Sequence, residues 1–144
     1  MIRYPLIPAT ALAAALTLAA SCANAASIPD NIAAAVADTN RPDADKQRDA
    51  NRKPAETLAF TGVKTGEQIA ELLPGGGYYT RIFSKAVGGS GHVYAVVPAP
   101  FPDAPADAPD FAARVKAIAA DPNYSNVSVV VEPFSQLPCR RLWI

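Results

Sequence analysis

The sequence is poor in the side chains that most often carry metal or nucleophilic chemistry. Among its 144 residues there is one histidine, and its two cysteines lie far apart. Zinc sites need closely grouped ligands of these types, so a metal site is not expected. The histidine, His92, opens a predicted strand, whereas sites in open α/β sheets lie at the carboxyl ends of strands. A catalytic set built on histidine is therefore not expected either.

The chain also lacks an excess of charge of either sign. It has 13 Lys and Arg residues against 13 Asp and Glu residues. Proteins that bind nucleic acid or anionic membrane surfaces usually carry a basic excess, so neither partner is expected. Apolar residues make up 50% of the chain, which is enough to build the core of one domain.

A long apolar run occurs only near the start of the chain. Residues 1–25 have the layout of a secretory signal peptide, with a positive charge at Arg3 and small residues at Ala23 and Ala25 for cleavage. The apolar core between them is short for a bilayer span, although a retained membrane anchor stays open as an alternative. We expect a periplasmic or secreted protein with no stable membrane span after cleavage. Cys139 would then be its one thiol, so no internal disulfide is expected.

Residues 26–63 are predicted to form a helical cap that packs on a sheet. A proline followed by an alanine-rich run indicates the first helix. Further on, Asp45 with Arg48 and Asp49 with Lys53 have the spacing of ion pairs on a solvated helix face.

After this cap the apolar pattern alternates between a period of two and a period of 3.6 residues. The predicted strands are 68–72, 92–97 and 127–131, and the predicted helices between them are 79–87 and 111–120. Phe111 is expected on the buried face of the second helix. This order predicts an α/β fold, a partial Rossmann-like three-layer sandwich with about three parallel strands, over residues 64–138. The proline-rich segment 98–109 either covers a site or is a stiff connector.

The stretch from Glu71 to Gly77, Glu-Leu-Leu-Pro-Gly-Gly-Gly, is the most informative motif. It places an acidic residue at the end of the first strand and a glycine turn before a helix. Glycine allows positive φ angles and a close approach of the backbone to a ligand. The first turn of the helix offers free N–H groups. Because open α/β sheets bind ligands at the carboxyl ends of their strands, this motif predicts a ligand site.

Several stretches together resemble a group of secreted predicted methyltransferases of the class I S-adenosylmethionine (SAM) dependent superfamily. They are Arg52-Lys-Pro-Ala-Glu56, Leu58-Ala-Phe60, Gly66, Glu71-Leu-Leu-Pro-Gly-Gly-Gly-Tyr-Tyr-Thr-Arg81 and Val93-Tyr-Ala-Val96. The resemblance covers about residues 32–138. It implies transfer of a methyl group from SAM to a small acceptor that the sequence does not identify. It names no catalytic residue.

The resemblance implies that the acidic residue and the glycine turn hold the methionyl part of SAM. The second strand's end, Val97, occupies the position that binds the ribose in the superfamily, where an acidic residue is usual. Glu132 corresponds to the adenine side, and Tyr78 and Tyr79 could present ring faces to the cation. The candidate cofactor-binding residues are therefore Glu71, Pro74, Gly75, Gly76, Gly77, Tyr78, Val97 and Glu132.

The chain also differs from class I methyltransferases in ways that favour other interpretations. Enzymes of this class have about seven strands, and residues 139–144 do not align with a fourth, so we expect a truncated product. An exposed sheet edge would then allow self-association. A non-catalytic binding module or an inactive remnant is the alternative function. A nicotinamide-dependent oxidoreductase is disfavoured because Thr80 stands where its fingerprint needs a third glycine.

Overall fold

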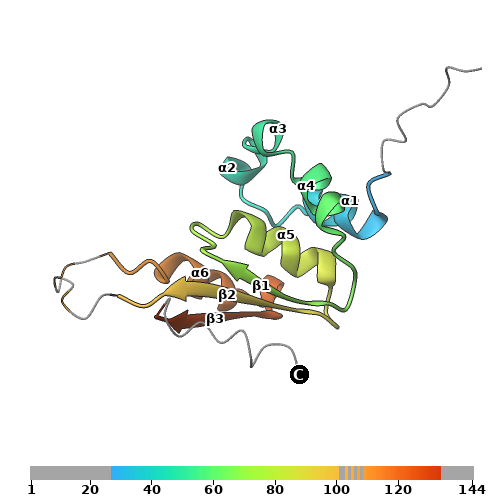
Figure 1. Cartoon of the computed structure of the whole chain (residues 1–144). Helices are drawn as coiled ribbons and strands as arrows, with labels where there is room; N and C mark the ends of the chain where they lie inside the picture. Colours follow the sequence, from blue (N-terminus) through green and yellow to red (C-terminus); the bar gives the residue numbers. More distant parts are fainter. Residues whose placement is uncertain (1–26, 101–102, 104, 106, 108, 134–144) are drawn as a thin grey trace, which may run out of the picture.

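A parallel three-stranded sheet forms the base of the protein (Figure 1). The computed structural model describes residues 27–100, 103, 105, 107 and 109–133. The predicted signal peptide, the tail 139–144 with Cys139 and part of the proline-rich segment lie outside these residues. The strands are β1 (Gln68–Leu72), β2 (His92–Pro98) and β3 (Val127–Glu132), in the order β1-β2-β3. The α/β class and the parallel sheet are confirmed.

The described helices either precede β1 in the N-terminal segment or lie between consecutive strands, as the sequence predicts. They are α1 (Asp30–Val36), α2 (Asp43–Lys46), α3 (Asp49–Arg52), α4 (Pro54–Thr61), α5 (Tyr78–Val87) and α6 (Ala113–Ala119), with a 3-10 turn η1 (Pro122–Tyr124). None of the helices in the described ranges combines the length and the apolar character needed to cross a bilayer.

The core lies between the sheet and the helices α5 and α6. Alternate residues of β2, namely Val93, Ala95 and Val97, are buried in it, as a strand with one covered face requires. The two helices add Ile82 and Val115, both fully buried, to the same cluster. This packing fixes the carboxyl ends of β1 and β2 beside the first turn of α5, where the glycine turn lies.

The N-terminal helices pack on α5 rather than directly on the sheet, which differs from the prediction for the cap (Figure 1). Asn31 of α1 donates hydrogen bonds to the carbonyls of Ala86 and Val63, at 3.1 and 3.4 Å. The α5 helix is therefore buried on two sides, by the sheet and by the cap. Its amphipathic pattern in the sequence shows only that it has a buried face and does not identify both neighbours.

One of the two predicted ion pairs in the cap is wrong. Asp45 and Arg48 lie 3.8 Å apart, as predicted. Asp49 instead binds the fully buried guanidinium of Arg41 with two hydrogen bonds of 2.7 and 2.9 Å. Lys53 has a left-handed backbone (φ 45°) that ends α3, so the helical spacing on which its pairing with Asp49 depended is not maintained.

The second predicted helix starts two residues late, and this changes the place of Phe111. Asp110 accepts a 2.8 Å hydrogen bond from the Ala112 amide in the turn that leads into α6. Ala112 takes the buried position, and Phe111 is left 66% exposed. The prediction that Phe111 belongs to the buried face is therefore wrong. It lies at a cavity instead.

Candidate ligand site at the glycine turn

The carboxylate of Glu71 is held at the end of β1 by the first turn of α5. Thr80, which is fully buried, donates a 2.5 Å hydrogen bond to Glu71 Oε2. Burial raises the pKa of Glu71 above its ordinary value, and the hydrogen bond from Thr80 opposes part of this rise. Within the described residues the second oxygen, Oε1, accepts no hydrogen bond, so it is available to a cationic ligand group.

The turn after β1 has three residues in the left-handed region of φ. They are Leu73 (58°), Gly75 (58°) and Gly77 (77°). The Leu73 amide continues the sheet by donating to Val96 O at 3.0 Å. A Cβ added to Gly75 would meet no atom within 4 Å. Gly75 therefore presents bare backbone to open space, as a close approach to a ligand requires.

Gly77 serves packing rather than an open ligand surface. A Cβ at this position would lie 2.0 Å from Cδ1 of Ile118 in α6. The neighbouring carbonyls of Gly76 and Gly77 each accept a 3.2 Å hydrogen bond from Arg81. Of the three glycines, Gly75 is thus the one whose conformation and surroundings best fit ligand contact.

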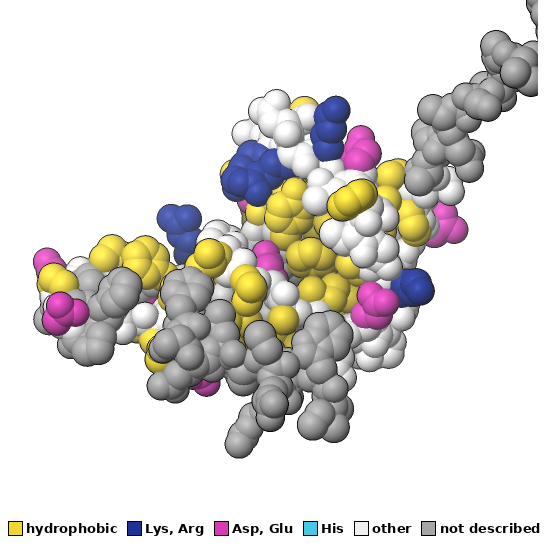
Figure 2. Space-filling view, viewed as in Figure 1, with side chains coloured by type: hydrophobic (Ala, Val, Ile, Leu, Met, Phe, Trp, Pro, Cys, Tyr) yellow, Lys and Arg dark blue, Asp and Glu magenta, His cyan; other side chains and the backbone are white. Residues whose placement is uncertain are grey.

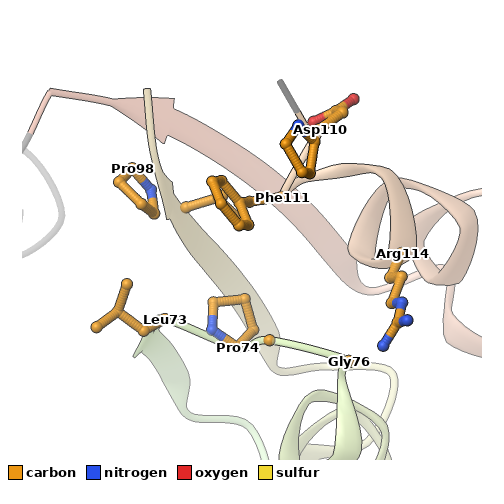
Figure 3. A pocket seen from close by; sticks show the side chains of 10 residues that line it. Leu73, Pro74, Gly76, Pro98, Asp110, Phe111 and Arg114 are labelled. Carbon is orange, nitrogen blue, oxygen red and sulfur yellow. The ribbon is translucent and has the colours of Figure 1, made fainter. Parts of the chain in front are cut away.

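A cavity of about 560 Å³ opens on one side of the turn. Its wall is largely apolar, with Arg114 and Asp110 as its charged residues (Figure 3). Phe111 and Pro98 lie across it from Leu73 and Pro74. The residues that line it are Leu73, Pro74, Gly75, Gly76, Val97, Pro98, Pro109, Asp110, Phe111 and Arg114. Its size and apolar wall suit a flat organic group such as a nucleobase.

A second cavity, of about 360 Å³, adjoins the other side of the turn and is charged. Glu71 contributes a carboxylate to it, and Arg48 and Arg52 contribute guanidinium groups. Figure 2 shows basic side chains gathered over the α2–α3 region beside a hydrophobic surface. The remaining lining residues are Thr57, Leu72, Leu73, Pro74, Gly75, Gly76, Tyr78, Tyr79 and Phe83. Residues 73–76 therefore line both cavities.

Tyr78 lines the charged cavity, but its polar group and ring are already engaged. Its hydroxyl donates a 2.6 Å hydrogen bond to Asp49. The guanidinium carbons of Arg41, Arg48 and Arg52 lie 5.5, 5.3 and 4.8 Å from its ring centre. These cation–π contacts occupy the ring that the sequence offered to a ligand cation. Burial is the main cause that raises the pKa of the Tyr78 hydroxyl, so it stays protonated.

The two other predicted site residues lie in different places. Val97 is buried and belongs to the wall of the apolar cavity, next to Pro98. Glu132 is the last residue of β3, and its carbonyl accepts a 3.0 Å hydrogen bond from the Ala99 amide. It lines neither cavity. Six of the eight predicted residues thus line a cavity, and Gly77 and Glu132 do not.

The arginines of the site, Arg48, Arg52 and Arg114, were not predicted from the sequence. Arg48 and Arg52 belong to a polar stretch with the charge pattern of a solvated helix, and Arg114 has no motif around it. Arg52 does open one of the stretches on which the methyltransferase resemblance rests, and this was the available signal. Among the described residues no group of three or more potential metal ligands is found.

Comparison with models of known protein families and with curated proteins gives no match. The function is therefore inferred from the geometry of the site and from the resemblance of the motif.

Proposed function

We propose that the chain binds SAM across the glycine turn, as a protein of the class I methyltransferase type. The observation that supports this is the division of the site by residues 73–76 into a charged cavity and an apolar one. SAM has the same division, with an amino-acid end, a sulfonium in the middle and an adenosyl end. A ligand lying over Gly75 would place its ends in the two cavities.

The cationic groups of SAM match the free carboxylate oxygen of Glu71. Opposite charges at short range are worth most where water is partly excluded, and Glu71 is half-buried. The adenine would lie in the apolar cavity, against Phe111, Pro98 and Leu73. The sulfonium would then lie near the bare backbone of Gly75.

The proposed reaction is transfer of the SAM methyl group to a small acceptor. A lone pair of the acceptor attacks the methyl carbon, the carbon–sulfur bond breaks, and the electron pair leaves with sulfur as a thioether. The protein supplies orientation, which can provide a large part of the acceleration in such a transfer. This agrees with a site that binds and aligns without a nucleophile of its own.

Binding without catalysis is the second candidate, and Val97 with Pro98 favours it. In the superfamily an acidic residue at this point binds the ribose hydroxyls, and these two side chains cannot accept hydrogen bonds. An assay with labelled SAM and small acceptors separates the candidates. Methyl transfer above the rate of the Glu71→Gln variant supports the enzyme, and binding without transfer supports the module.

Calorimetric titration of the purified chain with SAM tests the proposal. We expect one binding event for the wild type and for Glu132→Gln, because Glu132 lies at a strand end outside both cavities. Glu71→Gln removes the charge while keeping the size of the side chain. It should weaken binding about tenfold, the loss expected for one charge-assisted hydrogen bond. No heat from folded wild-type protein, with folding checked by circular dichroism, would refute the proposal.

A further inference from the structure

The charged cavity is lined by both negative and positive side chains. The Glu71–Gly77 motif contributes only the negative one. Glu71 supplies the negative group, whereas Arg48 and Arg52 come from the N-terminal helical segment. We propose that Arg52 binds the α-carboxylate of an amino-acid ligand whose α-ammonium group lies at Glu71. The choice of SAM as the ligand rests on the proposed function. The new assignment is that Arg52 holds the carboxylate end of this ligand.

Three arginines surround the Tyr78 ring, and Arg52 is the one without a carboxylate partner among the described residues. Arg41 is buried against Asp49, and Arg48 lies 3.8 Å from Asp45. For Arg52 no carboxylate of the described residues lies within 4.0 Å. An arginine that is unpaired and lines a cavity is well suited to a carboxylate ligand, which it can bind through two parallel hydrogen bonds.

The guanidinium of Arg52 lies against two aromatic rings and has no carboxylate partner among the described residues. It lies 4.8 Å from the ring centre of Tyr78 and 5.8 Å from that of Tyr79. The Arg52 carbonyl accepts hydrogen bonds from Tyr79 at 3.4 Å and from Thr57 at 3.3 Å. Contact with an aromatic ring orients a guanidinium without using its N–H donors, which point outward in the plane of the guanidinium itself. In Arg52 these donors make no hydrogen bond to the described part of the chain, so a ligand can use them.

The turn between α3 and α4 places Arg52 at the charged cavity. Arg52 ends α3, Lys53 takes a left-handed backbone, and Pro54 begins α4. Lys53 is exposed and does not line the cavity. The N-terminal segment therefore completes the ligand site in addition to covering α5.

A ligand with both charges fits this cavity better than one with a single charge. A carboxylate alone would meet Glu71, and an amine alone would meet Arg48 and Arg52. A zwitterionic amino-acid group places each charge beside its opposite. Removal of the carboxylate from SAM gives decarboxylated SAM, which keeps the amine, the sulfonium and the adenosyl group and is the matched probe.

The experiment measures the affinities of SAM and decarboxylated SAM by calorimetry for the full chain and two variants. The wild type should bind SAM at least tenfold more tightly, because hydrogen bonds to charged groups are worth that much or more. Arg52→Gln should lose this preference while binding decarboxylated SAM as the wild type does. Lys53→Gln removes the neighbouring charge and should keep the preference. An unchanged preference in Arg52→Gln would overturn the assignment and leave SAM binding intact.

A titration with L-methionine separates the two proposals. If SAM does not bind but L-methionine does, and Arg52→Gln abolishes its binding, the carboxylate site stands and the SAM proposal fails. If neither ligand binds to folded wild-type protein, both are refuted. Arg52→Lys keeps the charge but not the paired donors, so it should recover only part of the preference. Circular dichroism confirms that each variant is folded.

Discussion

Thr80 donates a 2.5 Å hydrogen bond to Glu71, and this contact joins the end of β1 to the first turn of α5. It fixes the side chain that the sequence offers as the acidic group of the site. One carboxylate oxygen accepts this hydrogen bond, and the other accepts none from the described residues. The motif therefore stabilises the contact between β1 and α5 and is also the candidate binding site.

Loss of the Thr80 hydroxyl should destabilise the protein measurably. Thr80→Val keeps the shape of the side chain and removes the donor. We expect the free energy of unfolding to fall by about 1–3 kcal/mol, because a half-buried carboxylate loses its partner. Urea denaturation measures this change. Thr65→Val, at an exposed position, is the matched control, and equal effects of the two changes would contradict this role of Thr80.

The affinity for SAM should increase as the pH rises through the acidic range. Burial raises the folded-state pKa of Glu71, so its carboxyl stays protonated to a higher pH than an exposed one. A protonated carboxyl does not attract the ligand's cationic groups, and binding should strengthen as Glu71 ionises. Calorimetry from about pH 4 to pH 7 covers this range. Glu71→Gln should remove the dependence. If the variant keeps the wild-type slope, another group controls it.

Replacement of Leu73 by glycine should stabilise the protein. The φ angle of Leu73, 58°, is unfavourable for a side chain with a Cβ, and the side chain is 60% exposed. We expect Leu73→Gly to raise the free energy of unfolding by about 1 kcal/mol. Leu72→Gly, at an equally exposed position where β1 ends, should lower it, because glycine weakens a strand. Destabilisation of similar size in both variants would refute the strain at Leu73.

The glycines of the turn should separate into a binding position and a packing position. Gly75→Ala adds a methyl group facing open space, so its cost comes from φ alone, about 1–2 kcal/mol. Gly77→Ala has the same φ cost and also collides with Ile118, so it should destabilise more. The affinity for SAM should fall in Gly75→Ala by more than the loss of folding stability in that variant accounts for. Thermal unfolding and calorimetry give the two quantities, and the reverse order of stability would contradict the assignment.

The pair Arg41 and Asp49 should control the stability of the N-terminal segment. Asp49→Asn leaves the buried guanidinium without its counter-charge, and we expect a loss of about 3 kcal/mol. The hydrogen bonds from Arg41 are the main cause that lowers the pKa of Asp49. Its stabilisation is therefore complete above the unfolded pKa and is lost as the pH falls through the lower folded pKa. Acid titration of unfolding measures this. Asp43→Asn, at an exposed carboxylate, should show no such effect.

The sequence predicted those parts of the fold that depend on local patterns. The β-branched run at residues 127–131 and the amphipathic stretch at 79–87 each became the predicted element, within one residue at the ends. Contacts between distant segments were not predictable in this way. Tyr78 binds Asp49, 29 residues earlier, and this contact depends on how the N-terminal helices pack on α5. The place of Arg52 beside the glycine turn depends on the same packing, and its local charge pattern indicated only a solvated helix.

The most direct test of a ligand that spans the glycine turn is an NMR titration of the isotope-labelled chain with SAM. We expect shifts at three places together: the Gly75 amide, the Arg52 side-chain Nε–H and the Phe111 ring. Glu132, outside both cavities, should not respond. Saturable shifts in one cavity that leave the Gly75 amide unchanged would contradict a ligand lying across the turn.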